Sequence, residues 1–486
     1  MHSSAHTDPA TWLAELAQRH PERLLLSTPG AEQLSYGAMN RLVDQIAAAL
    51  AHRAVAPGDR VVAQVEKSPA AIALYLACLR IGAVFVPLNT AYTSAEIEYF
   101  LGDADPKVTV GVAQGGISLA ELTRSLPAML GREWVGAVRP MTDLAALLYT
   151  SGTTGRSKGA MLTRANLATN AVTLAQAWRF TERDVLLHAL PIFHVHGLFV
   201  AINTVLASGS SMLFLPKFDA DEVVRLLPEA TVLMGVPTFY TRLLQHPGFT
   251  RERCANVRLF VSGSAPLLAE THREFRARTG HAILERYGMS ETLMNTSNPY
   301  DGERVAGSVG PALPGVEVRI AAPVGMIEVR GPNVFKGYWR MPEKTAAEFH
   351  EDGFFITGDV GRIDERGYLF IVGRAKDLII SGGYNVYPVE VETELDALAG
   401  VAESAVIGVP HPDFGEGVTA VVVPRPGTAL DESAVRAALE QRLAKYKLPK
   451  RIVFVTEMPR NAMGKVQKAA LRETYSGLYN SPTSSH

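Results

Sequence analysis

The chain has 486 residues, of which 47% are hydrophobic and 20% are charged, and its formal net charge is −2. This length predicts two or three domains, and the small net charge argues against a protein whose main task is bulk binding to nucleic acid. The two cysteines, Cys78 and Cys254, have no metal-ligand spacing around them, which favours a protein of the reducing cytosol.

The most apolar stretch of the sequence lies at residues 69–89. The N-terminal segment before it carries acids and lacks a continuous apolar run, so we do not expect a signal peptide. Within the stretch, Arg80, Gly82 and Pro87 interrupt the apolar pattern. This predicts a buried helix followed by a strand rather than a membrane span. We therefore expect a cytoplasmic protein with no membrane partner.

A loop rich in glycine and hydroxyl groups follows the short apolar run "DLAALLY". The run predicts a buried strand, and the loop, "TSGTTGRSKG" at residues 150–159, offers backbone N–H groups, hydroxyls and the cation of Lys158. Such a loop is suited to cradling phosphates. Its glycine spacing and the residue after Lys158 differ from those of a P-loop NTPase, so we expect a phosphate loop of another kind.

Strand-like runs alternate with helical patterns through most of the chain. Examples are "RVVAQVE" before "PAAIALYLACLR", "TVLMGV" before "PTFYTRLLQ", and "VRLFVSG" before "APLLAETHREFRART". This alternation predicts α/β layers with parallel strands. Turn-rich segments at residues 350–359 and 363–373 then indicate a smaller, tighter β region.

The pattern of strand-like and helix-like segments changes at about Lys376. Beyond it, "GYNVYPVEVETELDAL", "SAVIGVPHPDFGEGVTAVVVP" and "DESAVRAALEQRLAKYKLP" alternate strand and helix in a module long enough to be a separate domain. We predict a large N-terminal domain at residues 1–375, built of layered α/β subdomains with a small β region. A small, mobile α+β domain is expected at residues 376–486.

The order of the motifs resembles the adenylate-forming superfamily, which contains acyl-CoA synthetases, adenylation domains of peptide synthetases and luciferases. The motifs are "YTSGTTGRSKGA", "LPIFHVHG", "GVPTFY", "SGSAPL", "ERYGMSET", "GSVGPALPG", "FFITGD", "GYLFIVGRAKDLIISGGYNVYPVEVE" and "NAMGK". The resemblance runs nearly from end to end. Within the superfamily, "ALPIFHVHGLF", "MGVPTFYTRLLQ", "ERYGMSETLMNTSNPYDG" and "PRNAMGKVQK" are similar to the malonyl-CoA synthetases.

The resemblance implies an AMP-forming acid–thiol ligase that uses ATP, CoA and Mg²⁺. A carboxylate would attack the α-phosphorus of ATP to give an acyl-adenylate and pyrophosphate, and the CoA thiol would then displace AMP. Positioning and charge stabilisation would carry the rate of both steps. The acid implied by the resemblance is malonate or methylmalonate.

The resemblance also assigns residues to ATP. Tyr287 would offer a flat face to adenine, and Asp359, at the end of a strand, would accept hydrogen bonds from the ribose hydroxyls. Arg374 would approach the ribose or the phosphates. The implied ATP-binding set is Thr150, Ser151, Gly152, Thr153, Thr154, Gly155, Lys158, Tyr287, Gly288, Met289, Asp359 and Arg374.

Three residues are implied in the chemistry itself. Ser290 would donate to the α-phosphate, and Glu291 is a hard oxygen ligand suited to Mg²⁺. Lys465 would reach from the small domain to the carboxylate and phosphate oxygens as a flexible point charge. The same lysine would be a target for a protein acetyltransferase, because acetylation removes its charge. Without the resemblance, a lysine in a glycine-containing loop would be taken as solvated.

Malonate needs a partner for its second carboxylate, because a buried anion without one costs several kcal/mol. The segment "PIFHVHG" offers His194 and His196 on one side of a short strand, since residues two apart share a face. An arginine fork suits a carboxylate, although either arginine alone would be taken as a surface or ion-pair residue. The resemblance places five residues at this carboxylate: His196, Arg242, Ser262, Ser264 and Arg286.

The CoA site and the hinge follow from the same resemblance. The turn containing Gly382 would face the active site only in the thioester-forming arrangement of the two domains. Lys376 would be the hinge between them. The implied pantetheine tunnel consists of His194, Ser381, Gly382, Gly383 and Tyr384.

The chain departs from the superfamily at two places, near Gly111 and near Ala321, where it is shorter. Either these loops are short or segments are missing, and both places lie far from the expected chemistry. Two alternatives to malonate stay open: another small carboxylic acid, or an adenylation enzyme that loads a carrier protein. The second is disfavoured because no acid precedes the strand "FVSG" to pair with an amino-acid ammonium.

Overall fold

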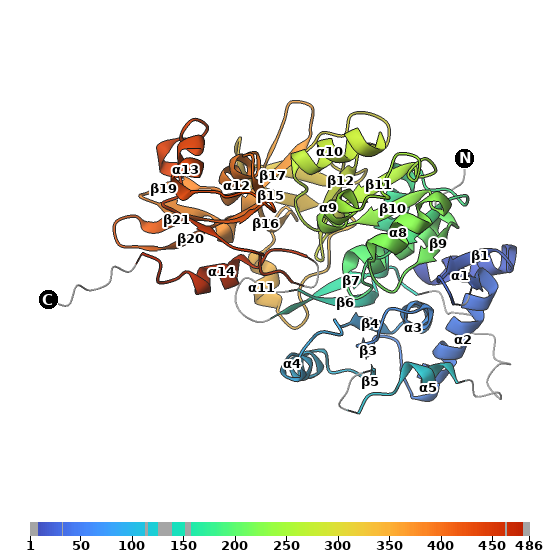
Figure 1. Cartoon of the computed structure of the whole chain (residues 1–486). Helices are drawn as coiled ribbons and strands as arrows, with labels where there is room; N and C mark the ends of the chain where they lie inside the picture. The colour runs from blue at the N-terminus through green and yellow to red at the C-terminus, as the bar shows by residue number, and fades with distance from the viewer. Residues whose placement is uncertain are drawn as a thin grey trace.

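The computed structural model describes residues 8–31, 33–111, 115–124, 139–150, 157–461 and 464–479. Within these ranges the chain forms three sheets in a large N-terminal domain and one sheet in a small C-terminal domain. Figure 1 shows the small domain, in orange and red, beside the α9 and α10 end of the large one. The predicted α/β fold with a small C-terminal domain is confirmed.

The first sheet has five strands in the order β5-β3-β4-β6-β7. Strands β6 and β7 pair antiparallel, and the pairing ends with Thr150 opposite Lys158, so the predicted phosphate loop leaves and returns at these two residues. The strands are β3 (Arg60–Ala63), β4 (Val84–Pro87), β5 (Val108–Val110), β6 (Leu144–Thr150) and β7 (Lys158–Thr163). The helices of this region are α2 (Tyr36–His52), α3 (Pro69–Ile81), α4 (Ser94–Ala104) and α5 (Leu119–Thr123).

Helix α3 shows how local sequence sets its bounds. Ser68 caps the first turn by accepting from the Ala71 N–H, Pro69 occupies the first helical position, and Gly82 ends the helix with a left-handed φ of 80°. The helix is apolar on nearly every side because it is buried, and β4 follows it. The predicted helix and strand are confirmed. Of the helices in the described part of the chain, none combines the length and the apolar character that a membrane crossing requires.

The second sheet has eight strands in the order β13-β12-β11-β10-β8-β9-β1-β2, and its central strands run parallel. The predicted strand–helix pairs β10–α9 and β11–α10 are confirmed. The strands are β1 (Leu24–Ser27), β2 (Gln33–Ser35), β8 (Val185–His188), β9 (Ser211–Phe214), β10 (Val232–Gly235), β11 (Leu259–Ser262), β12 (Leu284–Met289) and β13 (Leu293–Ser297). The helices are α1 (Pro9–Arg19), α6 (Arg164–Ala177), α7 (Asn203–Ser208), α8 (Ala220–Leu226), α9 (Pro237–Gln245) and α10 (Ala269–Thr279).

The third sheet is the predicted tight β region. It has four antiparallel strands: β14 (Glu317–Ile320), β15 (Gly325–Arg330), β16 (Phe355–Ile363) and β17 (Leu369–Arg374), with α11 (Pro342–Ala347) between β15 and β16. Strands β14 and β15 are antiparallel neighbours joined by residues 321–324, so the short segment near Ala321 is the connection of a hairpin. Much of the other short segment, residues 112–114 and 125–138, lies outside the described residues.

The sheet of the small domain is covered on both faces. In β20, Ala405, Ile407 and Val409 belong to one apolar cluster, whereas Val406 belongs to another, as the alternation of side chains along a strand requires. The strands are β18 (Ile379–Ser381), β19 (Tyr384–Val386), β20 (Val401–His411), β21 (Gly415–Pro424) and β22 (Arg451–Phe454). The helices are α12 (Pro388–Asp396), α13 (Glu432–Glu440) and α14 (Lys468–Thr474).

The two domains touch on the side of the large domain where α9 and α10 lie. Arg425, which follows β21, pairs with Glu270 of α10 at 3.1 Å between Nη2 and Oε1. A Cβ on Gly464 would lie 3.1 Å from the Thr238 hydroxyl of α9. The segment that carries Lys465 therefore packs directly against the start of α9.

Candidate active site

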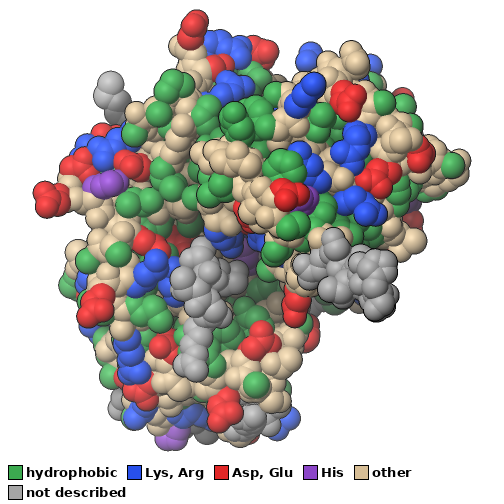
Figure 2. Space-filling view, turned by 90° about the vertical axis from the view of Figure 1, so that its left-hand side faces the viewer, with side chains coloured by type: hydrophobic (Ala, Val, Ile, Leu, Met, Phe, Trp, Pro, Cys, Tyr) green, Lys and Arg blue, Asp and Glu red, His purple; other side chains and the backbone are tan. Residues whose placement is uncertain are grey.

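Several of the predicted site residues lie at the end of the parallel strand β11, within the neighbouring strand β12, or in the segments that follow β8 and β10. The carboxyl ends of parallel strands meet at one edge of a sheet, which is where open α/β sheets bind ligands. Ser262 is the last residue of β11, and Arg286 and Tyr287 lie within β12. Figure 2 shows a hollow near the middle of one face of the molecule, with lysine or arginine side chains visible inside it.

Arg286 is a buried cation without a full set of partners. It is 3% exposed, and its Nε and Nη2 atoms have no hydrogen-bond acceptor among the described residues. Burial lowers the pKa of this guanidinium to about 9. A Cβ on Gly263 would lie 2.4 Å from its Cζ, so the guanidinium occupies space that only a glycine leaves open. A buried guanidinium with two N–H groups unpaired can donate hydrogen bonds to the carboxylate of a bound ligand.

His196 lies beside this cation, but not on the predicted strand. It begins a π-helix, η2 (His196–Ile202), and His194 lies in the turn before it. The prediction of a strand was wrong. His194 lies in a turn and His196 is the first residue of a helix, so their spacing of two residues does not mark one face of a strand. The ring Nδ1 of His196 lies 3.3 Å from the Ser264 hydroxyl, and Nε2 has no partner among the described residues. Burial, and then the Arg286 charge, lowers the pKa of His196 well below its usual value.

The structure therefore brings together four of the five residues predicted at the distal carboxylate. Ser262 is fully buried, and its hydroxyl is unpaired in the described structure. Ser264 holds a left-handed φ of 72°, a conformation that L-residues adopt at a cost. Arg242 differs, since it is exposed in the last turn of α9. It lies four residues after Thr238 and so shares the helix face that the Lys465 segment approaches.

A second group joins Tyr287, Asp359 and Arg374. The Tyr287 hydroxyl donates to Asp359 Oδ2 at 2.6 Å, and Arg374 Nε lies 3.0 Å from Oδ1 of the same carboxylate. Asp359 lies inside β16, opposite Arg374 of β17, so the predicted position at a strand end was wrong. Each carboxylate oxygen retains a lone pair, so the group keeps the capacity to accept from two ribose hydroxyls.

Glu291 is the centre of a third group, which spans several elements. Its Oε1 accepts from the Tyr338 hydroxyl at 3.1 Å and from the Thr150 hydroxyl at 3.3 Å. The Tyr338 hydroxyl also lies 2.7 Å from Glu348 Oε2, so its single proton is shared between the two carboxylates, and Glu348 pairs with Lys158 at 3.3 Å. Burial raises the pKa of Glu291, so a cation beside this carboxyl would offset its desolvation.

The sequence prediction missed Tyr338 and Glu348. Both lie in the segment "KGYWRMPEKTAAEFHEDG", whose residues have no metal or nucleophile spacing. Their link to Lys158 and Glu291 is made by chain folding, because those residues are more than 40 positions away in sequence. The predicted loop residues Ser151, Gly152, Thr153, Thr154 and Gly155 lie outside the described residues. Ser290, Gly288 and Met289 lie at the end of β12 and in the turn that follows it.

Lys465 reaches this site from the small domain. Burial, and then the Arg374 charge, lowers its pKa to about 8, while Asp359 and Glu291 act in the opposite direction. The charge of Lys465 also helps to lower the pKa of His194 to about 3, after burial. The lysine therefore lies among the residues predicted for ATP and those predicted for the acid.

The predicted CoA turn lies elsewhere on the small domain. Gly382 and Gly383, both at positive φ, connect β18 with β19 after Ser381. Tyr384 is 59% exposed and stacks on Tyr446 at 4.8 Å between ring centroids. Lys376 lies in the short 3-10 turn η4 (Ala375–Asp377), which connects the β region of the large domain to β18.

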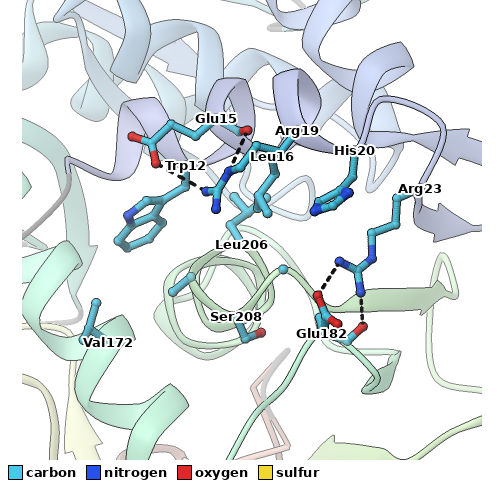
Figure 3. Close-up of a pocket in the computed structure, with 12 residues that line it drawn as sticks. Trp12, Glu15, Leu16, Arg19, His20, Arg23, Val172, Glu182, Leu206 and Ser208 are labelled. Atoms are coloured by element: carbon cyan, nitrogen blue, oxygen red, sulfur yellow. Dashed lines mark hydrogen bonds and ion pairs between the residues drawn. The ribbon is translucent and has the colours of Figure 1, made fainter. Parts of the chain in front are cut away.

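A separate pocket lies between α1 and α7 (Figure 3). Its charged side chains pair with one another: Arg19 with Glu15, and Arg23 with Glu182 at 3.0 Å. None of the predicted site residues lines it. The pocket therefore lacks the unpaired buried cation that distinguishes the group around Arg286.

Comparison with known proteins identifies the chain at the level of its family. The family model "AMP-binding enzyme" matches residues 13–339, and the model "AMP-binding enzyme C-terminal domain" matches residues 390–465. The chain belongs to the AMP-binding enzyme family. Its segments with Lys158, Glu291 and Arg286 fall in the first match, and Lys465 falls at the end of the second.

Several members of the AMP-binding enzyme family are similar over most of their length. A malonate–CoA ligase of Arabidopsis thaliana is 36% identical over 450 residues, covering 81% of this chain and 74% of the relative. A feruloyl-CoA synthase of an Amycolatopsis species is 36% identical over 468 residues, covering 92% of this chain and 95% of the relative.

Solved structures of the family also match nearly the whole chain. The ATP-bound MatB of Rhodopseudomonas palustris is 55% identical with a TM-score of 0.92, and its apo form gives a TM-score of 0.80; both comparisons cover 97% of this chain and 100% of MatB. The MenE protein of Bacillus subtilis in complex with ATP and magnesium is 29% identical, with a TM-score of 0.85 over 95% of this chain and 99% of MenE. This AMP-binding enzyme is an AMP-forming acyl-CoA ligase, with ATP, CoA and a carboxylic acid as substrates and Mg²⁺ as cofactor.

The donors around Glu291 fit a magnesium ion. Among the described residues, no group of three acidic, histidine or cysteine side chains could hold a metal by itself. Mg²⁺ takes few protein ligands when nucleotide phosphates and waters complete its shell, so a single carboxylate beside hydroxyl groups is sufficient. Glu291, with the Thr150 hydroxyl 3.3 Å from it, supplies this arrangement at the start of the phosphate loop.

Proposed function

We propose that this acyl-CoA ligase joins malonate to CoA through a malonyl-adenylate. The observation that carries the proposal is the buried Arg286 guanidinium, with its Nε and Nη2 atoms unpaired in the described structure. Ferulate or acetate would leave this cation without an anion, whereas malonate keeps a second carboxylate after the first has reacted. The malonate–CoA ligase among the relatives supports the same acid.

In the first half-reaction, one carboxylate of malonate attacks the α-phosphorus of ATP and pyrophosphate leaves. Arg286, His196 and the serines of β11 and its following loop would hold the other carboxylate, and thus orient the attacking one. Tyr287 and Asp359 would fix the adenosine, since they already form one hydrogen-bonded group. The rate enhancement would come from alignment of the two reactants.

Charge stabilisation would come from Lys465 and from the residues around Glu291. The charges of Asp359 and Arg286 act on the pKa of Lys465, which supports a role in which its ammonium would contact the attacking carboxylate and the α-phosphate together. Mg²⁺ held by Glu291 would neutralise negative charge on the phosphates. Lys158 would lie beside the same phosphates, after exchanging its ion pair with Glu348 for one with ATP.

In the second half-reaction, the CoA thiol attacks the carbonyl of the malonyl-adenylate, and AMP leaves. Lys465 would withdraw with the small domain, and the turn at Gly382 and Gly383 would approach in its place. The exposure of Tyr384 is consistent with a surface that is covered only in that second arrangement. Lys376 would be the residue about which the small domain rotates.

The function is tested with the purified protein, ATP, Mg²⁺, CoA and a panel of acids. Malonate is expected to give a kcat/KM at least about 100-fold above that of acetate, because a buried anion–cation pair is worth several kcal/mol. Methylmalonate, succinate and ferulate complete the panel, and thioesters are measured by mass spectrometry. A comparable kcat/KM for acetate or ferulate would overturn the assignment to malonate but leave the CoA ligase activity intact.

Replacing Lys376 by proline is expected to slow thioester formation roughly tenfold while pyrophosphate release stays near wild type. Proline fixes φ at a position that must rotate between the two half-reactions. Single-turnover measurements of both products test this, and Lys376→Ala, which keeps backbone freedom, is the matched control. Lost pyrophosphate release with unchanged thioester formation would exclude Lys376 as the hinge.

A further inference from the structure

We propose that Arg460 and Glu403 are positioning residues that hold the turn carrying Lys465 in its adenylation geometry. The proposal rests on the proposed role of Lys465 in the first half-reaction. Arg460 is the last residue before this turn, and it pairs in an isolated antiparallel bridge with Val466, which follows Lys465. The two residues mark the base from which Lys465 projects.

The backbone of Lys465 is bonded on both sides to Asn461. The Asn461 N–H donates to the Lys465 carbonyl at 3.0 Å, and the Lys465 N–H donates to Asn461 Oδ1 at 3.0 Å. The Gly464 N–H donates to the Asn461 carbonyl at 2.9 Å. These bonds close the turn on itself, but none of them connects it to the sheet of the small domain.

Arg460 makes that connection. Its Nη1 donates to the carbonyl of Gly464 at 2.6 Å, and its Nη2 forms an ion pair with the Glu403 carboxylate on β20. The Gly464 carbonyl belongs to the peptide unit that leads into Lys465. A planar guanidinium holds two acceptors in fixed directions, so this side chain links the peptide before Lys465 rigidly to a strand.

The position of this peptide matters because Lys465 is long and flexible. A lysine side chain loses rotamer entropy when it is fixed, and a backbone that is already fixed limits the positions that its Nζ can reach. Gly464 is also constrained from the other side, since its φ is +73° and a Cβ there would lie 3.1 Å from Thr238 Oγ1. A displaced turn would move against α9 or withdraw the ammonium from the acid and ATP.

The geometry favours positioning over a general contribution to stability. The Arg460 and Glu403 side chains are each 31% exposed, and ion pairs at such sites add little to folding free energy. Both residues belong to the small domain, so the link moves with Lys465 when the domain rotates. A second ion pair, Lys468 with Glu392 at 2.6 Å, anchors the start of α14 and leaves the Gly464 carbonyl untouched.

The test measures both half-reactions in Arg460→Ala, Glu403→Ala and the double variant. Arg460→Ala is expected to slow malonyl-adenylate formation about 10- to 100-fold, as a catalytic group displaced by about 1 Å does, with thioester formation from supplied malonyl-adenylate within about twofold. Arg460→Lys is expected to restore part of the rate. Glu403→Ala is expected to be weaker and to add nothing in the Arg460→Ala background, because Glu403 acts through Arg460.

A second readout does not depend on activity. Hydrogen exchange of a peptide spanning residues 458–467 is expected to accelerate in Arg460→Ala, because the turn loses its link to β20. Arg442→Ala, which removes the exposed Arg442–Glu394 ion pair of the same domain, is the matched control and is expected to change neither readout.

Three results would overturn the proposal. They are a wild-type adenylation rate in Arg460→Ala, an equal loss in both half-reactions, and effects of Arg460→Ala and Glu403→Ala that multiply in the double variant. If the wild-type protein formed no malonyl-adenylate, the proposed function would fail instead. The exchange of the peptide would still decide whether Arg460 holds the turn.

Discussion

Replacing Lys465 by alanine is expected to lower the rate of malonyl-adenylate formation by about 10²–10³-fold, as the loss of one transition-state donor does in other enzymes. The charges of Asp359, Arg286 and Glu291 all act on the pKa of Lys465, and in the proposed function its ammonium meets the charge that develops on both reactants. The rate is measured as pyrophosphate release in a single turnover. Thioester formation from supplied malonyl-adenylate is expected to stay within a few-fold of wild type.

The contrast between the two half-reactions is what identifies the role of Lys465. A residue that supported the fold of the small domain would impair both, because the same domain serves both steps. Lys217→Ala, at an exposed lysine after β9, is the matched control and is expected to behave as wild type. An equal loss in both half-reactions of Lys465→Ala would refute the assignment.

Much of the fold was predictable because its signals are local. Ser68, Pro69 and Gly82 mark the bounds of α3, and the apolar run before Thr150 marks β6. The alternation of strands and helices in the sequence predicted the parallel sheet. The segments that follow its strands β8, β10, β11 and β12 begin at the carboxyl edge of this sheet. Motifs on successive loops converge there because the topology brings those loops to one edge.

The details of the site were not predictable, because they depend on contacts between distant residues. The space that the Arg286 guanidinium occupies is open because residue 263, directly after β11, is a glycine. The parallel pairing of β11 and β12 brings Arg286 beside this glycine. Tyr338 and Glu348 reach Glu291 and Lys158 through tertiary folding alone. The spacing of His194 and His196 fits a strand equally well, and the π-helix appears only in the packed structure.

Replacing Arg286 by alanine is expected to lower kcat/KM for malonate by several hundred-fold or more. Removing one partner of a buried charge pair costs about 3–5 kcal/mol, and every 1.36 kcal/mol is about tenfold in rate. The KM for ATP is expected to change little, because Asp359, Tyr287 and Glu291 are untouched. Arg286→Lys is expected to recover only part of the loss, since an ammonium cannot reproduce the fork of a guanidinium.

Acetate provides the internal control for this prediction, because it has no distal carboxylate. Its slow turnover is expected to change far less in Arg286→Ala, so the ratio of malonate to acetate kcat/KM should fall sharply.

Gly263→Ala tests the position of the Arg286 guanidinium without changing a charge, since the new methyl group would displace the guanidinium that now lies against Gly263. Arg242→Ala separates the two predicted arginines: a loss confined to malonate would add this exposed residue to the distal carboxylate site, and wild-type kinetics would leave Arg286 as the one predicted arginine in that site. Equal losses for malonate and acetate in Arg286→Ala would show that Arg286 supports the site in general, and the acid would then have to be sought among small acids of other kinds.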